Sequence, residues 1–233
     1  MSLIPILIDW LYPPKCMFCQ DILKVGVSDL CDICKDELEF ISGDVCPVCG
    51  IPKDKPNKAC NGCRNMHFSR NYALFLYDGN PREAIKRFKY KPRPQYAKYF
   101  GRLLAERFSD GISECDAIVG VPLHKDRERQ RGFNQADLLA KEIAHNVDII
   151  HLPKNSLLRV KQTKQQSSLG RHSRHNNIID AFHVSDSNLF KGKTIALVDD
   201  IYTTGATLNE CARIIKLAGA TQVICISLSI SDY

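Results

Sequence analysis

The chain has 233 residues, of which 44% are hydrophobic and 25% charged, a composition ordinary for a soluble globular protein and not for a membrane-embedded or disordered one. This length suits one α/β domain with a small appendage. The formal net charge of +6 is modest, so the distribution of charge along the chain matters more than its total.

The first eleven residues, MSLIPILIDWL, are mostly apolar. Asp9 interrupts them and no basic residue precedes them, so they make a poor signal peptide, and they are too short to span a bilayer. We expect an amphipathic helix packed on the protein, with peripheral membrane attachment as the alternative. Without a transmembrane segment or a secretory signal, the expected compartment is the cytoplasm.

Eight of the eleven cysteines form four C-x-x-C pairs: Cys16/Cys19, Cys31/Cys34, Cys46/Cys49 and Cys60/Cys63. Each pair presents two thiolates to one side, and two pairs complete a tetrahedral zinc site, so the pattern predicts two structural Zn²⁺ ions. Pairing the first with the second and the third with the fourth needs only short hairpin loops and is favoured. A crossed arrangement stays open. A redox role is disfavoured, because no βαβ pattern surrounds these pairs.

The charge of this region bears on its role. Residues 1–70 carry eight Lys/Arg and nine Asp/Glu, and each Zn(Cys)₄ centre adds about −2. The region is therefore negatively charged, and a negatively charged region binds phosphate groups poorly. We therefore favour a structural cap or a partner surface. A local basic patch for nucleic acid is the alternative, formed by Lys53, Lys55, Lys58 and Arg64. We expect an N-terminal helix with a double zinc ribbon at residues 1–70, and a second domain at residues 71–233.

The second domain begins with a predicted strand at residues 71–77 and a helical pattern at residues 81–108, broken at 91–94. Residues 80–110 hold nine basic and three acidic side chains, a balance of +6. These side chains either form solvated helix faces or make a positive wall that faces an anionic substrate or nucleic acid.

A buried strand is predicted at residues 117–121, and residues 122–132 follow it as a loop. Such a loop, at the carboxyl end of a parallel strand, is where α/β folds place ligand contacts. A helix at 133–146 should bury Ala136, Leu139, Ala140 and Ile143. Short strands are expected at 157–160 and 181–184. Between them lies a polar stretch whose composition indicates a mobile loop, because residues 154–175 contain six basic side chains and no acidic one.

The most informative stretch is residues 193–207. An apolar run at 195–198 predicts a buried parallel strand, and the adjacent carboxylates Asp199 and Asp200 follow it. A Thr-Thr-Gly-Ala-Thr turn then leads into a helix that ends near Gly219, and residues 222–229 form the last strand. The turn can aim backbone N–H groups and hydroxyls at a phosphate, assisted by the helix dipole.

Two carboxylates beside a phosphate would repel it unless they hold something else. Ribose hydroxyls can donate hydrogen bonds to them, and a bound Mg²⁺ can offset their charge, so the pattern indicates a sugar phosphate. The alternative is an ordinary βα turn with surface acids. A P-loop is excluded, because Ser187 occupies the position of its first glycine relative to Gly192 and Lys193.

The run VDDIYTTGAT resembles the signature by which type I phosphoribosyltransferases bind 5-phosphoribosyl 1-pyrophosphate (PRPP). With the Tyr-Pro-Pro start, the four cysteine pairs, VPLHKDRERQRGFNQA and LLRVKQTKQQSSLGRHSRHNN, in this order, the chain resembles the ComF family (ComFC/GntX-like). The resemblance implies a double zinc ribbon fused to an α/β domain of the type I phosphoribosyltransferase fold, which is a parallel-sheet core with flanking helices. It also implies an association with DNA uptake in natural transformation, and it names no acceptor substrate.

The resemblance assigns roles to positions of this sequence. Asp199 and Asp200 would hold the ribose hydroxyls, with Mg²⁺ accompanying PRPP. The turn would hold the 5′-phosphate through Thr203, Thr204, Gly205, Ala206 and Thr207. The loop beneath the pyrophosphate would be formed by Val121, Pro122 and Leu123, with charge added by Lys89, Arg127 and Arg131. Residues 161–175 match a segment that closes over PRPP, for which Arg174 and Asn177 are the expected contacts.

Two classes of function follow. The first is a phosphoribosyltransferase, or at least an enzyme that uses PRPP. The second is a non-catalytic protein that senses PRPP or handles single-stranded DNA with the same pocket and basic surface. Possible partners are accordingly PRPP, single-stranded DNA and other competence proteins. A segment that recognises a base would favour the first class, and none is identifiable in the sequence.

Overall fold

The computed structural model describes residues 13–24, 26, 27, 29–53, 60, 63–90, 94–161 and 178–231. The N-terminal helix expected before residue 12 and the expected contacts Arg174 and Asn177 lie outside the described residues.

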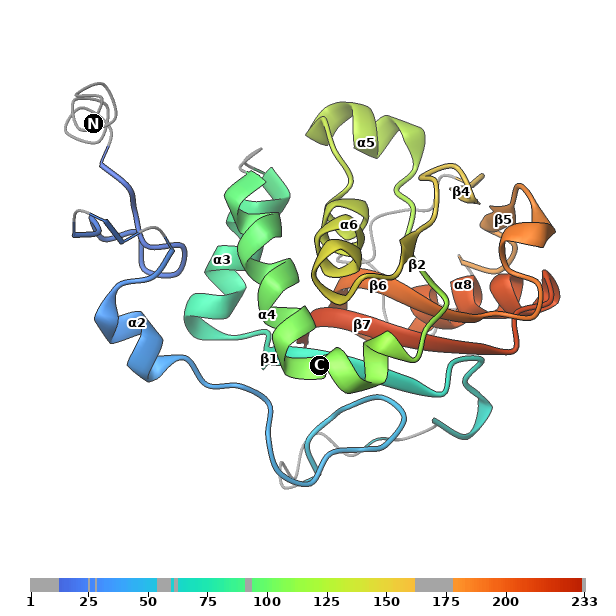
Figure 1. Cartoon of the computed structure of the whole chain (residues 1–233), viewed down its shortest axis with the longest axis horizontal. Helices are drawn as coiled ribbons and strands as arrows, with labels where there is room; N and C mark the ends of the chain where they lie inside the picture. The colour runs from blue at the N-terminus through green and yellow to red at the C-terminus, as the bar shows by residue number, and fades with distance from the viewer. Residues whose placement is uncertain are drawn as a thin grey trace.

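The centre of the molecule is a parallel sheet of five strands in the order β1-β7-β6-β2-β3 (Figure 1). These strands are β1 (Arg70–Leu76), β7 (Gln222–Ile230), β6 (Thr194–Tyr202), β2 (Ala117–Gly120) and β3 (Ile150–His151). The expected parallel α/β core is confirmed. The last strand of the chain lies inside the sheet, because β7 pairs with β1 on one side and with β6 on the other.

Helices cover both faces of the sheet. One face packs against α3 (Gly79–Tyr90), α4 (Pro94–Ser113) and α6 (Gln135–Val147), and the other against α8 (Ala206–Leu217). Strand β6 is buried on both faces, since Ala196 and Val198 join the first cluster while Ile195 and Leu197 join the second. A continuous apolar run such as 195–198 is the sequence pattern of a strand in this position.

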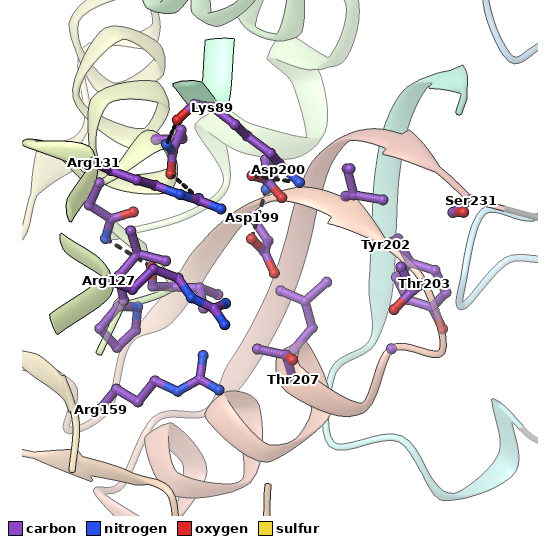
Figure 2. Close-up of a pocket in the computed structure, with 18 of the residues that line it drawn as sticks. Lys89, Arg127, Arg131, Arg159, Asp199, Asp200, Tyr202, Thr203, Thr207 and Ser231 are labelled. Atoms are coloured by element: carbon purple, nitrogen blue, oxygen red, sulfur yellow. Dashed lines mark hydrogen bonds and ion pairs between the residues drawn. The ribbon is translucent and has the colours of Figure 1, made fainter. Parts of the chain in front are cut away.

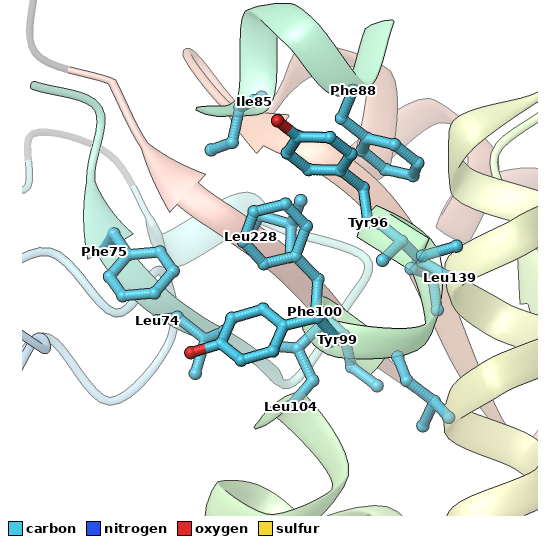
Figure 3. Packing of buried hydrophobic residues seen from close by; sticks show 14 of the residues in the cluster. Leu74, Phe75, Ile85, Phe88, Tyr96, Tyr99, Phe100, Leu104, Leu139 and Leu228 are labelled. Carbon is cyan, nitrogen blue, oxygen red and sulfur yellow. The ribbon is translucent and has the colours of Figure 1, made fainter. Parts of the chain in front are cut away.

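An aromatic cluster fills the space between α3, α4 and the sheet (Figure 3). Phe88 and Phe100 are fully buried, with ring centroids 6.0 Å apart, and Tyr96 stacks on Phe88. Such rings bury large apolar areas, so α3 is held firmly against the sheet. This fixes the helix whose last turn carries Lys89.

The first cysteine region (residues 16–41) packs into this core. The Phe18 ring packs edge-on against Phe75 and Phe100, with centroids 5.9 and 6.0 Å away. On α3, Arg87 donates hydrogen bonds to the carbonyl oxygens of Met17 and Phe18. The cysteine regions also cover the outer edge of β1, where Ile41 N–H donates to the Leu74 carbonyl and Asn71 N–H to the Val48 carbonyl, both at 2.7 Å.

The prediction of a loop at residues 122–132 is wrong, because this segment contains helix α5 (Lys125–Arg131). His124 caps this helix at its N-terminus, and Gly132 ends it in the left-handed conformation at φ +80°. Asp126 and Glu128 lie in the first turn, with Arg129 and Arg131 in the last, the order that suits the helix dipole. A helix of two turns with no buried residue has no apolar periodicity by which to find it.

The remaining elements are short. Strands β4 (Leu157–Arg159) and β5 (Phe182–Val184) were expected, and they form an antiparallel pair outside the main sheet. Helix α2 (Asp32–Glu37), the 3₁₀ turns Cys63–Asn65 and Ser187–Leu189, and β3 were not expected. Within the described residues, no helix combines the length and apolarity needed to cross a membrane.

Candidate functional site

A cavity of about 300 Å³ opens at the carboxyl ends of β2 and β6 (Figure 2). It brings together eleven of the residues singled out in the sequence: Lys89, Val121, Pro122, Leu123, Arg127, Arg131, Asp199, Asp200, Thr203, Gly205 and Thr207. Thr204 and Ala206 belong to the same turn but do not line the cavity. Sequence reasoning missed eight further lining residues: Tyr77, Asn134, Gln135, Arg159, Ile201, Tyr202, Leu208 and Ser231.

The acidic pair lies within β6, because this strand continues past residue 198 to Tyr202. Asp200 N–H donates to Asp199 Oδ1 at 2.8 Å, and Lys89 Nζ lies 3.2 Å from Asp200 Oδ2. Burial and the neighbouring Asp200 charge raise the pKa of Asp199 to about 7, against the opposing effects of that N–H, Lys89 and Arg159. The two carboxylates therefore have different surroundings. Asp200 forms an ion pair with Lys89, whereas Asp199 has a pKa above the ordinary value of an aspartate.

The turn after β6 is shaped by Gly205. Its φ is +74°, and a Cβ at this position would lie 2.4 Å from the Tyr202 hydroxyl, so both conformation and space favour glycine. Thr204 Oγ1 accepts from Ala206 N–H at 3.4 Å, and no side chain caps α8 at Gly205. The start of α8 lies at the edge of the cavity, which Gly205, Thr207 and Leu208 line, and the positive end of a helix dipole favours anions.

Among the described residues, four cationic side chains and two carboxylates line the cavity. Figure 2 shows the cations entering from the side opposite Tyr202 and Ser231. Burial and the nearby Arg127 charge lower the pKa of Arg159, whose guanidinium lies over the Phe182 ring at 5.4 Å. Arg159 comes from the β4–β5 pair, and the pattern of residues 157–160 does not indicate that it reaches β6. The excess of positive charge suits a ligand with more than one anionic group.

The second cysteine region (residues 46–68) packs against the turn that follows β6. Tyr202 is 3% exposed, and its ring packs edge-on against Phe68 with centroids 6.5 Å apart. Burial, and the charges of Cys49 and Cys63 nearby, raise the pKa of Tyr202. His67 N–H donates to Asn209 Oδ1 on α8 at 2.7 Å. The described residues of the cysteine regions do not line the cavity, yet they pack against the residues that shape it.

The cysteines gather as two groups of four, and in each group the sulfur atoms all lie within 4.8 Å of one another. The groups are Cys16, Cys19, Cys31, Cys34 and Cys46, Cys49, Cys60, Cys63. The predicted sequential pairing is confirmed, and the crossed one is wrong. Sγ–Sγ distances of 3.6 Å for Cys19–Cys31 and 3.4 Å for Cys46–Cys60 approach the roughly 3.8 Å implied by tetrahedral Zn–S bonds of about 2.3 Å. The donor set, four thiols gathered around one point in each group, fits zinc.

Comparison with known proteins identifies both parts. Residues 7–64 match the family described as double zinc ribbon domain, and residues 89–229 the family described as phosphoribosyl transferase domain. The DNA utilization protein YhgH of Salmonella typhi is 30% identical over 91% of this chain and 94% of its own length. The chain belongs to the ComF family. It is also 36% identical to competence protein F of Haemophilus influenzae, over 60% of this chain and 63% of that protein.

A third relative of this ComF-family chain is competence protein ComFC of Bacillus subtilis, 31% identical over 62% of this chain and 57% of that one. Among solved structures, an adenine phosphoribosyltransferase from Leishmania donovani is 14% identical with a TM-score of 0.41, covering 77% of this chain and 86% of that one. The fold assignment rests on the family match and on the parallel sheet.

Proposed function

We propose that this ComF-family chain binds PRPP with Mg²⁺ in the cavity at the ends of β2 and β6 and is a phosphoribosyltransferase. One observation carries the proposal. A carboxylate pair and the N-terminus of α8 border one cavity, which is lined by four cationic side chains among the described residues. PRPP has the matching parts, with a 5′-phosphate for the turn, ribose hydroxyls for the acids and a diphosphate for the cations.

Each group of residues has a role in this proposal. The turn from Thr203 to Thr207 binds the 5′-phosphate, and the acidic pair accepts hydrogen bonds from the ribose. The diphosphate lies by residues 121–123, with Lys89, Arg127 and Arg131 around it, and Arg159 adds a fourth cation. The carboxylates and diphosphate oxygens are hard ligands that suit Mg²⁺, which supplies charge neutralisation when bound.

The reaction is displacement at ribose C1′. The acceptor forms a bond to C1′ while the bond from C1′ to the diphosphate oxygen breaks, and the electron pair leaves with pyrophosphate. Residues of this chain contribute by orienting the ribose, neutralising the leaving group and excluding water. Arg174 and Asn177 remain the proposed contacts of a closing segment.

A second candidate function has its own support. The relatives are named for competence and for DNA utilization, and residues 154–175 are strongly basic. The alternative is a protein of DNA uptake that senses PRPP, or handles single-stranded DNA, without transferring a phosphoribosyl group. Pyrophosphate release in the presence of PRPP and a panel of nucleobases separates the two, because only a transferase releases it. In either case we propose a zinc-ribbon part at residues 1–70, a phosphoribosyltransferase-like part at 71–233, and a cytoplasmic location.

The acidic pair provides the test. Replacing Asp199 and Asp200 together by Asn keeps size and hydrogen-bonding reach but removes two charges. Because charge-assisted hydrogen bonds contribute roughly 1.5–3 kcal/mol each, Mg²⁺-dependent PRPP affinity should fall by about tenfold or more. Affinity for inorganic phosphate should fall little, or rise as repulsion is lifted. Calorimetry with both ligands measures this, and undiminished PRPP affinity in a folded double variant would remove the enzyme proposal.

A further inference from the structure

A buried amide connects the backbone of Lys89 to the guanidinium of Arg131, and both residues line the cavity. Gln135 is the first residue of α6, is 1% exposed and lines the cavity. Its Nε2 donates to the Lys89 backbone carbonyl at 3.1 Å, and its Oε1 accepts from Arg131 Nη1 at 3.0 Å. One side chain thus links the last turns of α3 and α5 to the start of α6.

Both contacts need an amide. The Lys89 carbonyl lies in the last turn of α3, where carbonyls lack a partner within the helix, and it requires a donor. The Arg131 guanidinium offers only donors and requires an acceptor. Gln supplies both from one planar group, and the two partners fix which end faces which. A carboxylate would place an acceptor against the Lys89 carbonyl, which is itself an acceptor. An apolar side chain would leave the Lys89 carbonyl and the Arg131 guanidinium without these hydrogen bonds.

The residues that Gln135 holds face the same ligand. Lys89 extends to Asp200, 3.2 Å away, and the Arg131 guanidinium lies over the Tyr90 ring at 5.3 Å, next to Lys89 in sequence. Figure 2 shows Lys89 and Arg131 both extending toward the acidic pair. The spacing of these two cations therefore depends on three helix ends that meet at Gln135.

We propose that Gln135 is a positioning residue that sets Lys89 and Arg131 at the spacing a diphosphate requires. The inference rests on the proposed function, since it concerns the diphosphate end of the same cavity. The phosphate-binding turn lies elsewhere in the fold, between the end of β6 and the start of α8. The loss of Gln135 should therefore weaken binding of pyrophosphate and spare binding of inorganic phosphate at the turn.

Gln135→Met is the test, because methionine fills a similar volume without hydrogen bonds. The control is Ile143→Val, a fully buried position two turns along the same helix that does not line the cavity. In Gln135→Met we expect pyrophosphate affinity to fall by roughly tenfold, as removal of a charge-assisted hydrogen bond implies, while phosphate affinity stays within about twofold. Ile143→Val should change neither. Equal decreases for both anions, or unchanged pyrophosphate affinity, would overturn the proposal.

A ligand-free measurement separates this inference from the proposed function. The crystal structure of Gln135→Met should show Arg131 displaced and the Lys89 Nζ to Asp200 distance beyond about 4 Å, the limit of an ion pair. If the wild-type protein binds neither anion, the proposed function fails and this structure alone decides the role of Gln135. Unmoved Lys89 and Arg131 side chains would then refute it.

Discussion

At the scale of single residues, Asp199 is the clearest case of a side chain whose pKa is changed by its surroundings. Burial and the charge of Asp200 raise its pKa to about 7 from an ordinary value near 3.8. The folded protein therefore holds a proton that the unfolded chain releases. Between about pH 4 and pH 7 the folded state binds more protons, so stability falls as pH rises through this window.

Asp199→Asn removes this titration. The contribution of Asp199 is fully present below about pH 4 and lost above about pH 7, so the variant should be more stable than wild type at pH 8, by roughly 1–3 kcal/mol, and gain much less at pH 5. Thermal unfolding across this pH range measures the difference. Lys89→Met is the opposite control, because removing the cation beside the pair should lower stability at pH 8. A gain for Asp199→Asn that did not vary with pH would contradict the assigned cause.

At the residue level, the sequence indicates cavity-lining residues best where these are contiguous in the chain. The acidic pair and the turn were found because strand, acids, glycine and helix start follow one another over fifteen residues. Arg159 and Gln135 were missed because their importance comes from tertiary contacts. Arg159 reaches the cavity from β4, and Gln135 is one polar residue in an otherwise ordinary helix start. A single buried amide that hydrogen-bonds to two other helices leaves no periodic signal in the sequence.

At the scale of elements, the strands other than β3 and the long helices were predictable, because their apolar patterns reflect burial. The expected buried face of α6, with Leu139, Ala140 and Ile143, is confirmed at 0% exposure. Helix α5 was missed for the converse reason. It buries nothing, and only its capping residues and charge order indicate it. This helix matters for the site, because it carries Arg127 and Arg131, which line the cavity.

The two cysteine groups should affect different ends of the cavity. Cys46→Ser disturbs the group that packs near Tyr202 and the turn after β6, the proposed phosphate site. Cys16→Ser disturbs the segment held by Arg87 on α3, the helix of Lys89. Each variant should lose one of two zinc ions by elemental analysis. We expect Cys46→Ser to weaken inorganic phosphate binding by roughly tenfold and Cys16→Ser to weaken pyrophosphate binding more than phosphate binding.

The two variants control for each other, because each removes one thiol from an equivalent group. If both lost zinc and kept wild-type affinity for both anions, the cysteine regions would be independent of the site. Wild-type protein with one zinc or none would contradict the double-ribbon assignment itself. From sequence alone the cysteine module looked separable, because spacing predicts a metal site but not the surface on which it packs.

At the scale of the whole molecule, charge is unevenly placed. Residues 80–110 and 154–175 each sum to +6, while residues 1–70 sum to −1 before any zinc thiolates are counted. Lys53, part of the basic patch considered for the ribbon, pairs with Asp44 at 2.9 Å, so its charge is already offset. In contrast, Lys161 is exposed just after β4, and its Nζ donates to the Ile179 carbonyl, a neutral acceptor that leaves its charge in place.

This distribution predicts where single-stranded DNA would bind. Charge reversal at Lys161 and Lys164 should weaken binding by roughly tenfold or more at low salt, because each cation near the strand releases counterions. The same reversal at Lys53 and Lys55 should have a smaller effect. The plot of log affinity against log salt should flatten for the first pair, by about 0.7 for each phosphate that the variant no longer neutralises. Fluorescence anisotropy with a labelled oligonucleotide at several salt concentrations measures both. The opposite ranking would return the DNA site to the ribbon and would separate DNA handling from residues 154–175.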